Sequence, residues 1–135
     1  MYLEPRQMQG AGLAAARSGR RRRARTVWLV SLLVTAVGAL FPHGSLPPGH
    51  FLRVGYDHWA HSLDWAWLTA LPFLFLHRSR ALTMSLGLVG FGLLIEVLQF
   101  FVPGRGCQLS DLASDIVGAA IGVCAGLLLQ RHFQE

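Results

Sequence analysis

The stretch from Ala81 to Val102, ALTMSLGLVGFGLLIEVLQFFV, decides the fold class of this chain. Its 22 residues contain a single ionisable side chain, Glu96. A helix of this length crosses the hydrocarbon of a bilayer with some tilt. We therefore predict that this stretch is a transmembrane helix.

The composition of the whole chain agrees with a membrane protein. Its 135 residues are 53% hydrophobic and only 14% charged, whereas a soluble domain carries about 25% charged residues. This hydrophobicity excludes a disordered chain, and two cysteines are too few for a disulfide scaffold. A nucleic-acid-binding protein needs a basic face on a folded surface, whereas here the basic run ends at an apolar stretch, so we expect no nucleic-acid partner.

Three further apolar runs accompany the first one. They predict transmembrane helices over residues 26–41, 59–76 and 112–129, joined by loops or short polar turns. The first of these runs has only 16 residues and follows an arginine cluster, so a cleaved signal peptide is an alternative to a retained helix. The predicted fold is an all-α integral membrane bundle of four transmembrane helices, with residues 26–130 forming one domain.

The arginines predict the orientation of this bundle. Residues 1–25 hold seven arginines and one acid, and we interpret them as a disordered cytoplasmic tail that contacts anionic lipid. With both termini inside, the inner segments hold ten arginines and the outer loops hold two. Inner loops of membrane proteins carry an excess of basic residues, so we expect both termini in the cytoplasm.

Polar side chains inside the apolar runs gather toward the predicted outer end. An ionisable residue in a membrane costs roughly 2.5 to 3.5 kcal/mol on insertion scales, so its position suggests a function. These residues share a face on each of three helices: Asp57, His61 and Asp64; Glu96 and Gln99; and Asp111 and Asp115. We expect the three helices to direct them into one pocket that opens to the outside.

Glycines on the last run indicate which way its carboxylates point. Gly118, Gly122 and Gly126 continue the helical face of Asp111 and Asp115. Small residues spaced four apart let transmembrane helices pack closely. The pattern therefore predicts that this face, with its carboxylates, lies against a neighbouring helix.

The predicted pocket holds more acids than bases. Five carboxylates stand against at most two arginines, Arg53 and Arg105, and they cannot all remain ionised close together in a low-dielectric site. Some are protonated, or a cation completes the site. The candidate ligands of a divalent metal are Asp57, His61, Glu96 and Asp111, and Arg105 suits a phosphate. The alternative is an ion-paired plug that holds three helices in register.

These motifs resemble the VanZ-like family of small bacterial multi-pass membrane proteins. The resemblance covers about residues 50–130 and rests on three motifs: DHWAH from Asp57 to His61, EVLQFFVPGR from Glu96 to Arg105, and Asp111 to Asp115 followed by Gly118 and Gly122. His58 stands where the family usually has lysine, and Asp115 where it usually has asparagine. The resemblance implies the bacterial cytoplasmic membrane and a likeness to a founding member that lowers teicoplanin susceptibility.

The functional hypothesis is a pocket that binds or acts on a lipid-linked cell-wall precursor or a phospholipid headgroup. The candidate ligand-binding residues are Asp57, Gln99, Arg105 and Asp115, and the candidate catalytic residues are Glu96, Asp111 and His61, with a carboxylate activating a metal-bound water. No G-x-S-x-G or H-E-x-x-H motif supports an enzyme, so that question stays open. The alternatives are a non-enzymatic accessory protein and a cation-coupled carrier, which would need a homodimer.

Overall fold

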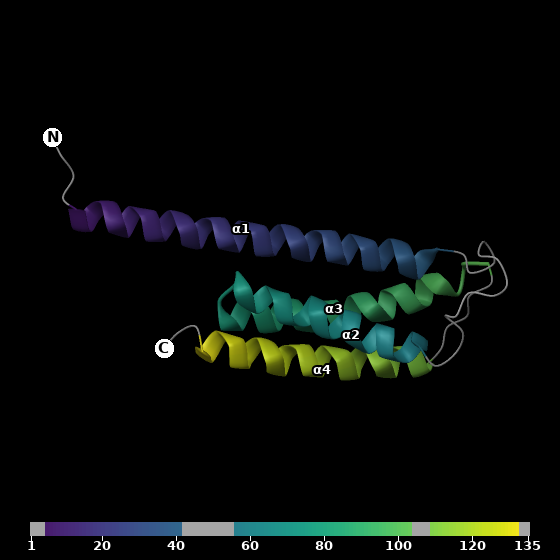
Figure 1. Cartoon of the computed structure of the whole chain (residues 1–135). Helices are drawn as coiled ribbons and strands as arrows, with labels where there is room; N and C mark the ends of the chain where they lie inside the picture. The colour runs from purple at the N-terminus through teal and green to yellow at the C-terminus, as the bar shows by residue number, and fades with distance from the viewer. Residues whose placement is uncertain (1–4, 42–55, 104–108, 133–135) are drawn as a thin grey trace.

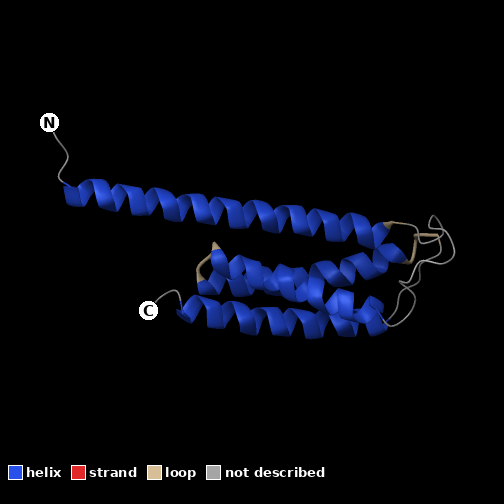
Figure 2. Cartoon of the chain, viewed as in Figure 1, coloured by secondary structure: helices blue, strands red, loops and turns tan. Residues whose placement is uncertain are grey.

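The computed structural model describes residues 5–41, 56–103 and 109–132. All regular structure in these ranges is helical, as Figure 2 shows, so the all-α prediction is confirmed for them. The elements are α1 (Pro5–Leu40), α2 (Tyr56–Ala70), the 3-10 helix η2 (Leu71–Leu74), α3 (Arg78–Gln99) and α4 (Leu109–His132).

Successive helices alternate in direction (Figure 1). Helix α1 starts at the end of the bundle where both termini lie, α2 and η2 return to that end, α3 leaves it, and α4 returns. Helices α2 and α4 therefore run parallel and pack on one another. We call the end with both termini the arginine-rich end, because it carries these arginines with described side chains: Arg17, Arg20, Arg21, Arg22, Arg23, Arg25, Arg78, Arg80 and Arg131.

Three described helical segments are long and apolar enough to cross a membrane: Ala14–Leu40, Arg78–Gln99 and Ser110–His132. Large apolar side chains cover their outer surfaces; Leu33, Leu86 and Leu128 are each more than half exposed. Exposed apolar area on this scale indicates contact with lipid. The chain therefore has the helices of a membrane protein.

The second predicted crossing has a different form from the other three. Helix α2 has only 15 residues, and at Leu71 the chain continues as the four-residue helix η2. Together the two helices rise by roughly 30 Å, about the thickness of the hydrocarbon core. The count of four crossings is thus not established by length and composition alone.

Residues 5–25 differ from their expected form. We predicted a disordered tail, whereas α1 is continuous from Pro5 to Leu40. Proline suits the first position of a helix, and arginine and alanine, the two most frequent residues in this segment, are strong helix formers. The apolar helix therefore extends back through the arginine cluster, whose side chains are exposed from Arg17 to Arg25.

Pro72 explains the change from α2 to η2 and one of the contacts that hold α1. A proline has no N–H, so the carbonyl of Leu68 four residues earlier loses its helical donor. The indole Nε1 of Trp28 donates a hydrogen bond to this oxygen at 2.9 Å. Trp28 also packs into a buried cluster with Trp65, Leu68, Leu71 and Leu88.

The glycines of α4 allow its backbone to touch α2, as predicted. A Cβ at Gly118 would overlap the backbone carbonyl of Ser62, and one at Gly122 would overlap the carbonyl of Ala66. At this short separation Ser62 Oγ donates to the Ser114 carbonyl at 3.0 Å. The close contact between these two parallel helices therefore holds the polar residues that α2 and α4 carry in a fixed relative position.

Candidate functional site

A pocket of about 320 Å³ lies where the polar faces of α2, α3 and α4 meet α1. Four ionisable side chains line it: His61 and Asp64 from α2, Glu96 from α3, and Asp115 from α4. Helix α1 forms one wall, with residues that include Val34, Thr35 and Gly38, and apolar side chains of α2 and α3 complete the lining. The structure thus brings three of the predicted helices together, and it adds α1 as a wall that we did not predict.

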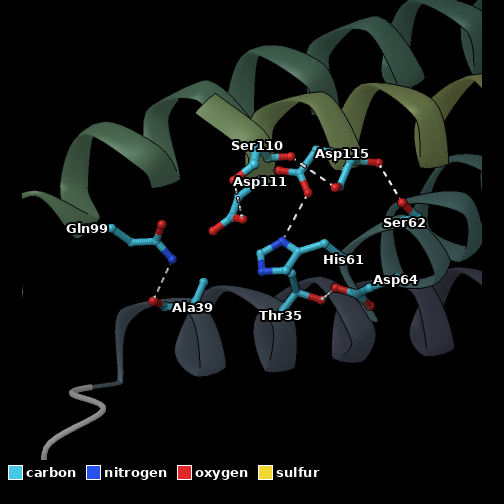
Figure 3. A network of polar contacts seen from close by, with 10 residues as sticks. Thr35, Ala39, His61, Ser62, Asp64, Gln99, Ser110, Asp111 and Asp115 are labelled. Carbon is cyan, nitrogen blue, oxygen red and sulfur yellow. Dashed lines mark hydrogen bonds and ion pairs between the residues drawn. The ribbon is translucent and has the colours of Figure 1, made fainter. Parts of the chain in front are cut away.

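His61 and Asp115 form the central pair of the pocket (Figure 3). The Nδ1 atom of His61 lies 3.1 Å from an Oδ1 oxygen of Asp115, which is 7% exposed. Gly92 makes room for the Trp65 ring beside this pair, because a Cβ there would lie 2.8 Å from that ring; its distance to an Asp115 oxygen, 3.4 Å, would be an ordinary contact. Two helices therefore present an imidazole and a carboxylate at a fixed separation.

Asp64 connects the pocket to α1. The hydroxyl of Thr35 donates to Oδ2 of Asp64 at 2.6 Å, which is a short hydrogen bond between two side-chain oxygens (Figure 3). One turn away, Trp67 Nε1 donates to Ser31 Oγ at 3.1 Å. These polar bonds set the register of α1 against α2.

Glu96 and Gln99 are both buried on α3, each 2% exposed, but they differ in place. Glu96 lines the pocket. Gln99 does not; its Nε2 donates to the Ala39 carbonyl at 2.9 Å, which ties the end of α3 to the end of α1. The ligand-binding role predicted for Gln99 stays a prediction, and the contact with Ala39 shows that its amide also positions α3 against α1.

Asp111 lies beside the pocket rather than in its lining. It is 8% exposed, one helical turn before Asp115, and one of its oxygens accepts from Ser110 Oγ at 3.4 Å (Figure 3). Arg105 lies outside the described residues, and so does the side chain of Asp57. The roles predicted for Arg105 and Asp57 therefore remain predictions.

The metal hypothesis receives no support from the described residues. Within residues 5–41, 56–103 and 109–132, no three histidine, cysteine or acidic side chains are grouped as a metal ion requires. His61, Glu96 and Asp111 are therefore not a sufficient ligand set by themselves. A site that also uses Asp57 stays a prediction.

Helix α1 is the part of the site that the sequence reasoning missed. Its inward face follows steps of three and four residues through Trp28, Ser31, Thr35 and Gly38. These residues contact the bundle or line the pocket. The sequence signal for this face was the recurrence of polar and small residues within an otherwise apolar run. Trp65 also supports the pocket, since it lines it and is buried at 3% exposure.

The charge of the chain is divided between the two ends of the bundle. In the described part, the pocket holds three carboxylates and one imidazole, and the arginine side chains lie at the arginine-rich end. Carboxylates in a confined site favour a cation or a group with several hydrogen-bond donors. The pocket is thus rich in oxygen acceptors, and its imidazole is already paired with Asp115.

A comparison with family models decides the relationship of the chain. The model described as VanZ/LLP1 matches residues 12–130. The chain belongs to the VanZ/LLP1 family. The match covers most of the chain, and it begins inside the segment that we had set apart as a tail. VanZ/LLP1 membership together with the membrane-like helices identifies a VanZ-like membrane protein. No curated protein and no solved structure gives a significant match.

Proposed function

We propose that the pocket binds or acts on the headgroup of an envelope lipid, either a phospholipid or a lipid-linked cell-wall precursor. The observation that carries this proposal is a pocket lined by His61, Asp64, Glu96 and Asp115 inside a bundle of membrane-like helices. Ionisable residues at such a position are costly and are kept for function. A stabilising plug would need fewer of them.

The limited burial of α1 in the bundle supports a lipid as the ligand. Only 11% of the most apolar stretch of α1 is buried inside the bundle, whereas 33% of the most apolar stretch of α3 is buried. The pocket lies along this weakly packed helix, and Val34 and Ile95 contribute apolar surface to its lining. A molecule with a polar head and an apolar tail can enter from the bilayer between α1 and the other helices.

The charge of the pocket supports a headgroup with an amine. Three carboxylates face one imidazole, so an ammonium group would be held by charge-assisted hydrogen bonds. Arg105 would bind the phosphate of the same headgroup. If the protein is an enzyme, Glu96 is better placed than Asp111, the other candidate base, because Glu96 lines the pocket and Asp111 does not.

The same proposal places the protein in the bacterial cytoplasmic membrane with both termini in the cytoplasm. Support comes from the two termini at one end of the bundle and from the arginines at that end (Figure 1). Inner loops carry the excess of basic residues. The combined rise of α2 and η2, roughly 30 Å, allows four crossings.

The first experiment identifies the lipid. The full chain is purified from bacterial membranes, and co-purified lipids are identified by native mass spectrometry for the parent, Asp115→Asn and Cys124→Ser. Cys124 is exposed on the same helix and serves as the matched control. We expect one amine-bearing lipid class to be retained by the parent and the control and lost in Asp115→Asn. Equal retention by all three proteins, or no retention, would reject the proposal.

The second experiment separates action on the lipid from binding. Cells with and without the gene are compared by lipidomics, by analysis of cell-wall precursors and by teicoplanin susceptibility. An enzyme changes the amount of its lipid substrate, and Glu96→Gln abolishes that change. A binding protein leaves the lipid pool unchanged while the purified protein still retains the lipid.

A further inference from the structure

A groove of about 470 Å³ lies at the arginine-rich end, far from the acidic pocket. Its lining comes from the segment after η2 and from the first turns of α3: Leu76, Ser79, Arg80, Thr83 and Met84. We propose that this groove binds one anionic phospholipid of the leaflet at that end, with Arg80 on the phosphate and with Leu76 and Met84 along the upper acyl chain. This site is separate from the pocket of the proposed function.

The groove combines the two kinds of surface that a phospholipid needs. Arg80 is exposed, and a guanidinium can form two parallel hydrogen bonds to phosphate oxygens. Leu76 and Met84 are half-buried and provide apolar surface beside it. The hydroxyl of Thr83 donates to the Ser79 carbonyl at 3.1 Å, so it remains able to accept but not to donate a second bond. Arg80 is therefore the charged contact for a phosphate, and the exposed Ser79 hydroxyl, 3.5 Å from His77 Nδ1, lies beside it in the lining.

The charge around the groove favours an anion. The arginine side chains of the described part of the chain all lie at this end, whereas its acidic side chains, which are Asp64, Glu96, Asp111 and Asp115, lie toward the opposite end. A concentration of arginines attracts anionic lipids to the membrane surface beside it. An anionic phospholipid is thus enriched at the mouth of the groove.

The register of α1 brings arginines to the level of the groove. The rings of Trp28 and Phe75 lie 6.2 Å apart, and Met84 packs against the buried cluster that contains Trp28. Arg25 and Arg22 precede Trp28 by three and six residues, about one and two helical turns toward the arginine-rich end. Arginines of α1 therefore stand near the depth at which a headgroup would lie.

The wall of the groove is fixed before any lipid binds. Gln130 Nε2 donates to the carbonyls of Phe73 and Leu76 at 2.9 and 2.8 Å, which joins the end of α4 to the segment that lines the groove. Ser85 Oγ lies 2.9 Å from the Ala81 carbonyl of its own helix and 3.2 Å from the Thr69 carbonyl of α2, so its single proton is shared between a bond within α3 and a bond to α2. A preformed site loses little conformational entropy when it binds.

The test uses the full chain in nanodiscs that contain phosphatidylcholine with a minor fraction of phosphatidylglycerol. Native mass spectrometry counts the phosphatidylglycerol molecules that remain bound to the parent, Arg80→Gln and Arg78→Gln. Arg78 lies on the same turn of α3 and does not line the groove, so both variants remove one positive charge at the same end. We expect Arg80→Gln to lower the retention of one phosphatidylglycerol about tenfold and Arg78→Gln to leave it within about twofold.

Two controls keep the proposal falsifiable. Arg80→Lys keeps the charge and is expected to restore part of the retention; failure of both Arg80 variants to differ from the parent rejects the site. An equal loss in Arg78→Gln and Arg80→Gln shows diffuse attraction and also rejects it. Glycerol phosphate added in excess is expected not to displace the lipid, and displacement would mean that the groove takes a soluble phosphate ester instead.

Discussion

Replacement of Gly118 by alanine tests the contact between α2 and α4. A Cβ at this position would overlap the carbonyl of Ser62 and lie 2.8 Å from its carbonyl carbon. Both groups belong to a helix backbone, so the overlap is relieved only if the two helices separate. Overpacking of this kind costs about 1 to 3 kcal/mol.

Gly90 provides the matched control. It lies in α3, and a Cβ there would meet nothing within 4 Å. Alanine is favoured over glycine in a helix by about 1 kcal/mol, so Gly90→Ala is expected to stabilise the protein slightly. The same gain offsets part of the clash at Gly118, and the two variants should differ by about 2 kcal/mol in free energy of unfolding.

The assay is reversible unfolding in mixed micelles by titration with a denaturing detergent, followed by tryptophan fluorescence. The expected order of stability is Gly90→Ala, then the parent, then Gly118→Ala. If Gly118→Ala is as stable as Gly90→Ala, the backbone contact between α2 and α4 does not exist, and the base of the pocket is placed wrongly.

Two further predictions concern the contacts that hold α1, and both use the same unfolding assay. Trp28→Phe keeps an aromatic ring but removes the indole N–H, which leaves the Leu68 carbonyl without its donor, so we expect the free energy of unfolding to fall by about 1 to 3 kcal/mol. Trp59→Phe is the control, because Trp59 is 74% exposed, and it should change the free energy of unfolding by less than about 0.5 kcal/mol. Thr35→Val removes the hydroxyl that bonds a pocket carboxylate and should cost about 1 kcal/mol. Thr26→Val is its control, because that hydroxyl bonds only within α1; equal effects of Thr35→Val and Thr26→Val would contradict the register of α1.

The fold was predictable where a single physical signal dominated. Continuous apolar runs indicated α3 and α4, and the four-residue spacing of Gly118 and Gly122 indicated the face on which α4 packs. The start of α1 was not predictable in this way, because the arginine cluster signals both a charged tail and a good helix former. A proline such as Pro72 is a sequence signal for a helix break, but no sequence signal shows that Trp28 of α1 bonds the released carbonyl.

The free-energy cost of ionisable residues in a membrane predicted most of the candidate site, whereas their helical spacing predicted it only in part. The cost of ionisable residues in a membrane singled out His61, Glu96 and Asp115, and all three line the pocket. Gln99 shared their helical face but reaches α1 instead, because spacing gives the side of a helix and not the partner across it. The wall from α1 was missed since Thr35 carries no charge and its bond to Asp64 is formed only in three dimensions.

Photolabelling of the pocket tests the central claim most directly. The full chain is reconstituted with an amine-headgroup phospholipid that carries a photoreactive group on its head, and the labelled peptides are mapped by mass spectrometry. The account predicts label on pocket residues of α1 and α3, such as Val34, Gly38 and Ile95, with loss of that label in Asp115→Asn. Label confined to exposed apolar positions such as Leu86, or unchanged by Asp115→Asn, would contradict it.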